Sequence, residues 1–372
     1  MSFRKQLSKL DINIIFISIF IALVCYYGYW DQQHQSFIAH DEGIYVGRAK
    51  KILETNSWFT PFQEPHHKTV GSYWLIALSI KLFGLSEFSA RLPSGIFSIL
   101  SSVSVYLISK EFISQRASLL AALLLPSMPL WLQYSRYASP DIAFIFFLLL
   151  SYLCLIRAYK NYSLKSSSPK LLIVISGFSI GIAFFIRSFM VVLPLFAIAP
   201  FIFSIRKFWT SSHLRMLSLG LSIGLIPSIL GIILSINNYG VESIHSLIGF
   251  AGNKAVGGSF LKSLVFYPLN IITLAFPLSF YSILGIRHIK QKQDSVTINY
   301  FIIYPLIVIA SLSLISSRHS HYSLIIYPHI AMLYGFAVDT MMQNGIKLGK
   351  KDRLSLAIPF ILVGLLLTLL GI

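Results

Sequence analysis

Residues 141–157 read DIAFIFFLLLSYLCLIR, a run of uncharged and mostly apolar residues between Asp141 and Arg157. A helix that crosses the hydrocarbon core of a bilayer needs about 20 such residues. The rest of the chain has the same character, since 55% of its 372 residues are hydrophobic and only 12% are charged. Soluble domains have about 25% charged residues. This composition excludes a water-soluble globular protein, and we expect an all-α polytopic membrane protein.

Ten further stretches resemble 141–157 in length and hydropathy, which gives about eleven transmembrane helices, within a range of 10 to 12. With 141–157 they cover residues 12–30, 92–109, 117–133, 141–157, 171–186, 189–205, 216–236, 263–286, 298–316, 322–338 and 354–371. The stretch 72–84 is also apolar, but it is short and carries Lys81. We interpret it as an interfacial helix that does not cross the membrane.

The distribution of charge sets the expected orientation. With the N-terminus inside, 19 of the 30 lysines and arginines lie in inner turns, as the positive-inside rule requires, and eight of the 13 acids lie outside. If 72–84 were a span, the basic stretches 157–170, 206–215 and 347–353 would face outward. The net charge of +17 therefore reflects topology, and we expect no nucleic-acid partner.

Two outer loops are long enough to hold a site. The first, 31–90, carries Asp41, Glu42 and Lys68, and the second covers 237–262. Polar chain of this length between membrane spans is typical of a functional loop. The alternative is that the pair Asp41 and Glu42 is only a solvated surface feature. We expect one integral-membrane domain over 1–372 with 31–90 as its catalytic loop and no soluble C-terminal domain.

Further charged residues lie on the same face. Arg136 and Asp141 occupy a second outer turn, where Asp141 could simply cap a helix. Arg187 interrupts an apolar region, which indicates function unless its side chain extends to the interface. Acids that accept a proton from a hydroxyl and cations that neutralise a departing phosphate are what a reaction at a lipid phosphate requires.

Four histidines are candidate ligands for a metal ion. His66 and His67, in the first outer loop, could meet His319 and His321, from a later outer turn, above the membrane. Spacings of this kind are weak evidence for zinc or another divalent ion, and interfacial histidines without metal are the alternative. His67 or His321 could instead bind phosphate.

The chain resembles the polyprenyl-phosphate-sugar-dependent glycosyltransferases of the C superfamily, in the branch with protein O-mannosyltransferases and the lipid A aminoarabinose transferase. The resemblance covers roughly residues 10–340. It rests on Asp41-Glu42 with Tyr45, Trp58, Pro61, Lys68, Tyr73-Trp74, Phe83-Gly84, Arg91-Leu92-Pro93, Arg136, Asp141, Gly177, Gly181, Arg187, His321-Tyr322 and Tyr327-Pro328. Two positions depart from the family pattern: Lys68 is followed by Thr69-Val70 where Lys-Pro-Pro is common, and Arg187 stands where lysine is frequent.

The resemblance implies an inverting transfer of a hexosyl or pentosyl group from a polyprenyl-phosphate sugar to a lipid, glycan or protein acceptor. It implies that Asp41 is the base, with Glu42 beside it and Asp141 as a second active-site acid. Lys68, Arg187, Arg136 and His321 would then bind the donor phosphate. We expect a bacterial inner-membrane protein with its site facing the periplasm. The alternatives are a flippase or transporter of lipid-linked sugars and a non-catalytic membrane subunit.

Overall fold

The structure is a computed structural model and describes residues 36–37, 41–165, 167–255, 260–276, 278–292, 294–315 and 318–343. The α-helices in these ranges are α2 (Asp41–Thr55), α3 (Gly71–Phe83), α4 (Glu87–Lys110), α5 (Gln115–Leu124), α6 (Pro129–Ser135), α7 (Asp141–Leu164), α8 (Lys170–Arg187), α9 (Val192–Ala197), α10 (Ala199–Ser204), α11 (Ser211–Tyr239), α12 (Glu242–Ala255), α13 (Phe260–Leu274), α14 (Leu278–Lys292), α15 (Ser295–Ile298), α16 (Tyr304–Leu314) and α17 (Tyr327–Gln343). Short 3₁₀ helices cover Leu125–Ser127, Ser188–Val191, Arg206–Phe208 and Ser320–Ile326, and a π-helix covers Asn299–Ile303. The spans expected at 12–30 and 354–371 lie outside the described residues.

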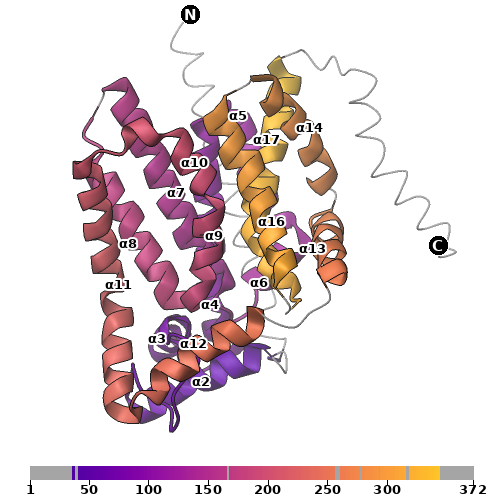
Figure 1. Ribbon diagram of the computed structural model, residues 1–372. Coiled ribbons are helices and arrows are strands. Elements are labelled where there is room, and N and C mark those ends of the chain that lie inside the picture. The colour runs from indigo at the N-terminus through magenta and orange to yellow at the C-terminus, as the bar shows by residue number, and fades with distance from the viewer. Residues whose placement is uncertain are drawn as a thin grey trace, which may run out of the picture.

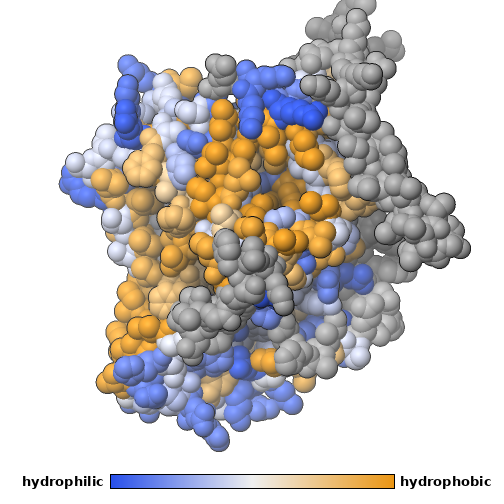
Figure 2. Space-filling model, turned by 45° about the vertical axis from the view of Figure 1, so that its right-hand side comes forward, coloured by the Kyte–Doolittle hydropathy of each residue, from blue (hydrophilic) through white to orange (hydrophobic). Residues whose placement is uncertain are grey.

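The long helices run side by side, and α2, α3 and α12 lie across one end of them, which we call the α2 end (Figure 1). Within the bundle α8 packs against α7 and α11, α7 also packs against α4, and α14 packs against α17. The surface in Figure 2 is hydrophobic over the middle of the molecule and hydrophilic toward both ends. Such a belt is what a bilayer covers.

Six described helical segments are long and apolar enough to cross a membrane, and the number rises to eight if each of two bent pairs is one span. The chain is therefore an all-helical polytopic membrane protein. The apolar stretch expected at 72–84 forms α3, whose 13 residues are too few to cross a bilayer.

Prolines explain why one expected span is broken. The stretch expected as one span over 117–133 forms α5 and α6, which are bent by 70°. Pro126 lies in the 3₁₀ helix after α5, and Pro129 begins α6. Because proline lacks the amide hydrogen and clashes with the preceding turn, a continuous helix cannot pass through both positions.

Glycines bring α8 and α11 into backbone contact. Gly177 and Gly181 of α8 face Gly220 and Gly224 of α11, and a Cβ atom at any of the four would lie less than 3.0 Å from backbone atoms of the other helix. Small residues four apart on both helices are the pattern that lets membrane helices approach closely. This contact fixes α8, whose last residue is Arg187.

Candidate active site

A polar cavity of about 120 Å³ lies at the α2 end. It is lined by Glu42, Tyr45, Lys68, Tyr134, Tyr137, Ala138, Ser139, Asp141, Arg187, His319, His321 and Tyr322. These residues come from α2, the segment before α3, the end of α6, the turn that follows it, the start of α7, the end of α8, and the segment that leads into α17. The structure thus brings together five of the residues predicted to be catalytic or phosphate-binding, Glu42, Lys68, Asp141, Arg187 and His321, and the metal-ligand candidate His319.

Arg187 and Asp141 form a buried ion pair in this cavity. Arg187 Nη2 donates to Asp141 Oδ1 at 2.5 Å, and the two side chains are only 10% and 8% exposed. Arg187 is the last residue of α8 and Asp141 the first of α7, so each charge is also favoured by the dipole of its own helix. The burial of Arg187 does not fit a side chain that extends to the interface, and Asp141 does more than cap α7.

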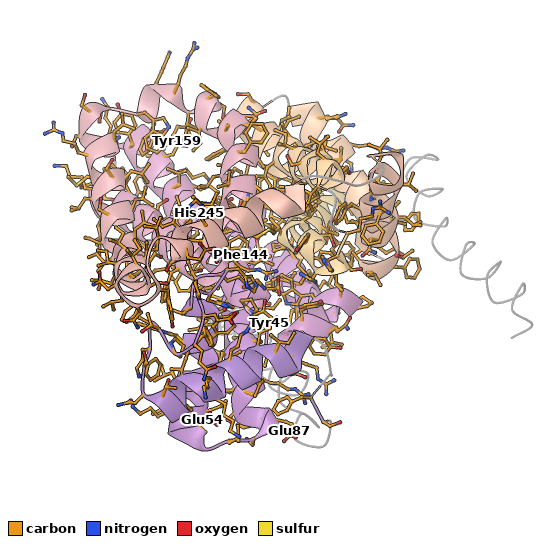
Figure 3. The ribbon with its side chains drawn as sticks, turned by 60° about the horizontal axis from the view of Figure 1, so that its bottom comes forward. Tyr45, Glu54, Glu87, Phe144, Tyr159 and His245 are labelled. Carbon is orange, nitrogen blue, oxygen red and sulfur yellow. The ribbon has the colours of Figure 1, made fainter. Side chains whose placement is uncertain are left out.

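Tyr45 contacts both cations of the cavity. Arg187 Nη1 donates to the Tyr45 hydroxyl at 3.3 Å, and the Lys68 ammonium lies 5.5 Å from the centre of the Tyr45 ring. A cation over an aromatic ring is attracted by the negative face of the ring. In Figure 3, Tyr45 lies where α2 meets the ends of the long helices. Tyr45 belongs to the family pattern, but the sequence alone predicted no role for it.

A larger, mainly apolar cavity of about 390 Å³ adjoins the polar one. Its apolar lining comes from the end of α8, the segment through α9, α12 and the end of α16, with Ile186, Phe189, Met190, Val192, Leu193, Phe196, Leu247 and Ile315. The two cavities share Tyr45, Lys68, Arg187 and Tyr322. Two cations therefore stand at the boundary between a polar space and an apolar one.

Glu42 is fully engaged in a second buried ion pair. Arg91 donates to its carboxylate through Nε at 2.7 Å and Nη2 at 2.9 Å, and the Ala138 amide donates to Oε1 at 2.9 Å. Glu42 is 1% exposed. Its contacts join α2 to α4 and to the turn that precedes Asp141. Arg91, like Tyr45, belonged to the family pattern without an assigned role.

Two of the predicted site residues are not placed in the cavity. Asp41 is the first residue of α2, but its side chain lies outside what the structure describes. Arg136 follows the last residue of α6, and it does not line either the polar or the apolar cavity.

The histidines near the site have protein partners. His321 Nδ1 lies 3.1 Å from the Tyr134 hydroxyl, and its ring stacks 5.3 Å from that of His319. His67 lines the apolar cavity. His66 Nε2 lies 2.9 Å from the Tyr73 hydroxyl, and burial, with the charge of Arg48 next, lowers the pKa of His66 to about 2. Among the described residues, no three or more His, Cys, Asp or Glu side chains are grouped so that they could hold a metal ion.

Comparison with known proteins yields one family match. Residues 67–230 match the family described as dolichyl-phosphate-mannose-protein mannosyltransferase. An uncharacterized protein of Aquifex aeolicus is 30% identical over 115 residues, which are 30% of this chain and 23% of that protein. The undecaprenyl phosphate-alpha-4-amino-4-deoxy-L-arabinose arabinosyl transferase 1 of Pseudomonas fluorescens is 28% identical over 200 residues, 51% of this chain and 34% of the transferase. The matches thus span about a third or less of these relatives' length.

Two solved structures share the fold. ArnT from Cupriavidus metallidurans, in a crystal structure with undecaprenyl phosphate, superposes with a TM-score of 0.78 at 16% identity over 94% of this chain and 64% of ArnT. The archaeal oligosaccharyltransferase AglB from Archaeoglobus fulgidus gives a TM-score of 0.61 at 14% identity over 95% of this chain and 54% of AglB. The resemblance to C-superfamily glycosyltransferases predicted from the sequence is confirmed.

Proposed function

We propose that this chain transfers a glycosyl group from a polyprenyl-phosphate-linked sugar to a lipid, glycan or protein acceptor. One observation carries the proposal: a polar cavity and an apolar cavity meet at Lys68 and Arg187. A polyprenyl-phosphate sugar has the same division, with a sugar, an anionic phosphate and an apolar chain in that order. The solved ArnT structure with undecaprenyl phosphate supports a carrier of this kind.

The proposed reaction is a single displacement with inversion at the anomeric carbon. An acceptor oxygen attacks this carbon, the bond to the phosphate oxygen breaks, and the electron pair leaves with the phosphate. The acceptor proton passes to the carboxylate of Asp41, and general-base catalysis of this type contributes about 10²–10⁴-fold. Lys68 and Arg187 offset the charge that gathers on the phosphate, where a water-poor site makes each contact worth more than in water.

The acids and remaining cations have supporting roles in this proposal. Asp141 is an active-site acid that holds the Arg187 guanidinium through their buried ion pair. Glu42 fixes the start of α2, and with it the backbone of Asp41, through Arg91. His321 lies on the polar wall near the sugar, and Arg136 is proposed only as a distant source of positive charge. A divalent metal ion is not required by this mechanism.

We propose that the whole chain forms one domain with eleven spans, an N-terminus inside and the α2 end at the periplasmic face of a bacterial inner membrane. Contacts at the two ends of α7 support two separate membrane crossings, one by α8 before Arg187 and one by residues 188–208 after it. Arg187 contacts Asp141 at one end of α7, whereas the Phe208 ring packs against Tyr159 and Tyr162 near the other. Residues 188–208 therefore run along the length of α7 after α8 has done so.

A transfer assay tests the proposed function. Purified protein is incubated with a panel of polyprenyl-phosphate sugars and acceptors, and release of free carrier phosphate is measured. Lys68→Ala and Arg187→Ala are each expected to lose about 10²–10³-fold in turnover, the usual effect of one lost contact to a developing charge. Lys50→Ala, which removes a lysine with a 55% exposed side chain from α2, is the control. A flippase would move lipid without releasing carrier phosphate, and that result would exclude the transferase.

A further inference from the structure

Lys68 and Arg187 line the same two cavities although they lie on separate segments. Lys68 precedes α3, and Arg187 ends α8. Like charges that face one space repel each other, and low dielectric strengthens the repulsion. The backbones that carry the two cations must therefore be held together by contacts of their own.

The next residue along the chain from each cation supplies such a contact. Ser188 Oγ accepts the Thr69 amide hydrogen at 2.9 Å, and the hydroxyls of Thr69 and Ser188 lie 2.8 Å apart. Thr69 Oγ1 donates to the Phe184 carbonyl at 3.3 Å, so the Ser188 hydroxyl donates to Thr69. Both residues are 8% exposed. An amide, two hydroxyls and a last-turn carbonyl of α8 thus form one chain of hydrogen bonds, in which each bond polarises the next.

Two features show that this junction is tightly specified. A Cβ atom on Gly71 would lie less than 3.0 Å from the backbone of Phe185, so the segment after Lys68 lies directly against the end of α8. Ser188 has φ 51° and ψ −135°, a conformation that glycine adopts readily and that is unfavourable for residues with a side chain. Backbone strain of this kind persists where its surroundings enforce it, commonly at functional sites. Here a serine hydroxyl is present where glycine would fit the backbone better.

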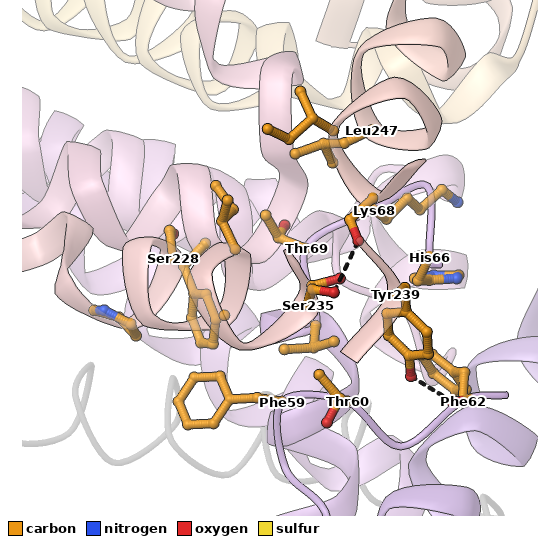
Figure 4. A pocket seen from close by; sticks show the side chains of 17 residues that line it. Phe59, Thr60, Phe62, His66, Lys68, Thr69, Ser228, Ser235, Tyr239 and Leu247 are labelled. Atoms are coloured by element: carbon orange, nitrogen blue, oxygen red, sulfur yellow. Dashed lines mark hydrogen bonds between the residues drawn. The ribbon is translucent and has the colours of Figure 1, made fainter. Parts of the chain in front are cut away.

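We infer that Thr69 and Ser188 are positioning residues that hold Lys68 and Arg187 side by side for the phosphate of the lipid carrier. The inference rests on the proposed function and extends it to two residues that do not themselves touch the reacting atoms. Thr69 lines a smaller pocket beside Lys68 (Figure 4), and Ser188 lines the apolar cavity. The hydrogen-bonded pair of Thr69 and Ser188 therefore lies in the cavity walls beside Lys68 and Arg187.

The test uses variants that remove the bond in different ways. Ser188→Ala leaves the buried Thr69 amide without its acceptor, Thr69→Val keeps the amide but removes the hydroxyl, and Thr69→Ser keeps both. Ser188→Gly removes the hydroxyl and also relieves the backbone strain. The matched control is Ser176→Ala on α8, which breaks a buried hydroxyl pair with Ser151 of α7, at 2.9 Å. Position 176 is about 16 Å from Arg187 at 1.5 Å per helical residue.

Two measurements are made on the full chain in detergent. The first is the Kd for undecaprenyl phosphate, which is expected to rise about 10-fold in Ser188→Ala, Ser188→Gly and Thr69→Val, in keeping with the loss of the buried hydrogen bonds that the removed hydroxyl makes. Thr69→Ser and Ser176→Ala are expected to stay within about 2-fold of wild type. The second is hydrogen exchange of residues 66–72 without lipid, which is expected to be faster in Ser188→Ala and Ser188→Gly only.

Ser188→Gly separates positioning from general stability, because its thermal midpoint is expected to equal or exceed that of wild type while its affinity falls. Unchanged exchange of residues 66–72 in both Ser188 variants overturns the inference, and so does an equal loss of affinity in Ser176→Ala. Failure of the wild-type protein to bind undecaprenyl phosphate overturns the proposed function instead. In that case the exchange measurement still decides whether Thr69 and Ser188 hold the two segments together.

Discussion

Glu42 and Asp41 are adjacent carboxylates with separate tasks in the proposed mechanism. Glu42 pairs with Arg91, and both side chains are almost fully buried, at 1% and 3% exposure. Removing one partner of such a pair leaves the other charge buried and uncompensated, which costs about 3–5 kcal/mol. The two carboxylates are therefore expected to respond differently to the same loss of charge.

Asp41→Asn is expected to leave the thermal midpoint unchanged and to abolish sugar transfer, whereas Glu42→Gln is expected to lower stability by about 3 kcal/mol. Thermal unfolding in detergent and the transfer assay are carried out on both variants. Wild-type turnover in Asp41→Asn would exclude it as the base. Wild-type stability in Glu42→Gln would show that the ion pair with Arg91 does not hold α2 in place.

His66 makes stability depend on pH. Burial lowers its pKa in the folded chain to about 2, with Arg48, His67 and Lys68 adding to the effect, whereas the unfolded chain titrates near 6.5. Between these values the unfolded state binds the extra proton, so stability falls as the pH drops below 6.5. From pH 7.5 to 5 the expected loss is about 2 kcal/mol.

His66→Gln keeps a hydrogen-bonding group beside the Tyr73 hydroxyl but removes the titration. As the pH is lowered from 7.5 to 5, the thermal midpoint of wild type is expected to fall more than that of His66→Gln. Parallel curves for the two proteins would contradict the burial of a neutral His66.

The sequence identifies charged residues more readily than the partners that hold them. Arg187 was predicted because a charge within an apolar region is conspicuous, and Lys68 because the family resemblance includes it, within a long outer loop. The pairing of Glu42 with Arg91 depends on a contact across 49 residues, which no local pattern reveals. Likewise, a tyrosine near an interface is ordinary, so the contacts of Tyr45 with both cations become visible only in three dimensions.

At the scale of the elements, the contact between α8 and α11 sets the position of Arg187. Gly220→Ala is expected to destabilise the chain by about 1–3 kcal/mol, because its Cβ atom would overlap the Val174 backbone and neither helix can move without losing its close packing. Gly47→Ala is the control. Gly47 lies on the exposed face of α2 with no atom near its Cβ position, and alanine is the better helix former.

Thermal midpoints of the two glycine variants give the comparison. Gly220→Ala is expected to unfold earlier than wild type, and Gly47→Ala at the same temperature or slightly later. Equal midpoints would mean that α8 and α11 can separate without cost, and that their glycines do not define the contact.

Hydropathy predicted the positions of the apolar segments better than it predicted whether each one is a continuous helix. The stretch 141–157 is a single helix, α7, as expected. The stretches 117–133 and 189–205 were expected to be continuous, yet the first is bent at its prolines and the second consists of part of one 3₁₀ helix, α9 and α10. A hydropathy average does not register where prolines lie, although two prolines three residues apart redirect the helix between α5 and α6.

At the scale of the whole molecule, the helix ends gather in two groups. Residues from the expected outer segments line the polar cavity at the α2 end. Residues from the expected inner turns meet at the other end, where Glu111 pairs with Arg157 at 3.1 Å and, together with Lys160 and Asp294, lines a separate cavity. Asp339 likewise accepts the Ser114 amide at 3.0 Å, which joins the end of α17 to the start of α5. These contacts agree with the alternation on which the predicted topology depends.

Cysteine labelling decides which end faces outward. Glu64 precedes α3 at the α2 end, and Lys165 follows α7, and both are exposed. Because the basic turns favour the cytoplasm, Glu64→Cys is expected to react with an impermeant thiol reagent in intact spheroplasts, and Lys165→Cys only after permeabilisation. Both variants are made with Cys25 and Cys154 replaced by serine. The reverse pattern would place the polar cavity on the cytoplasmic side, where a periplasmic acceptor cannot reach Asp41, and would refute the proposed orientation of transfer.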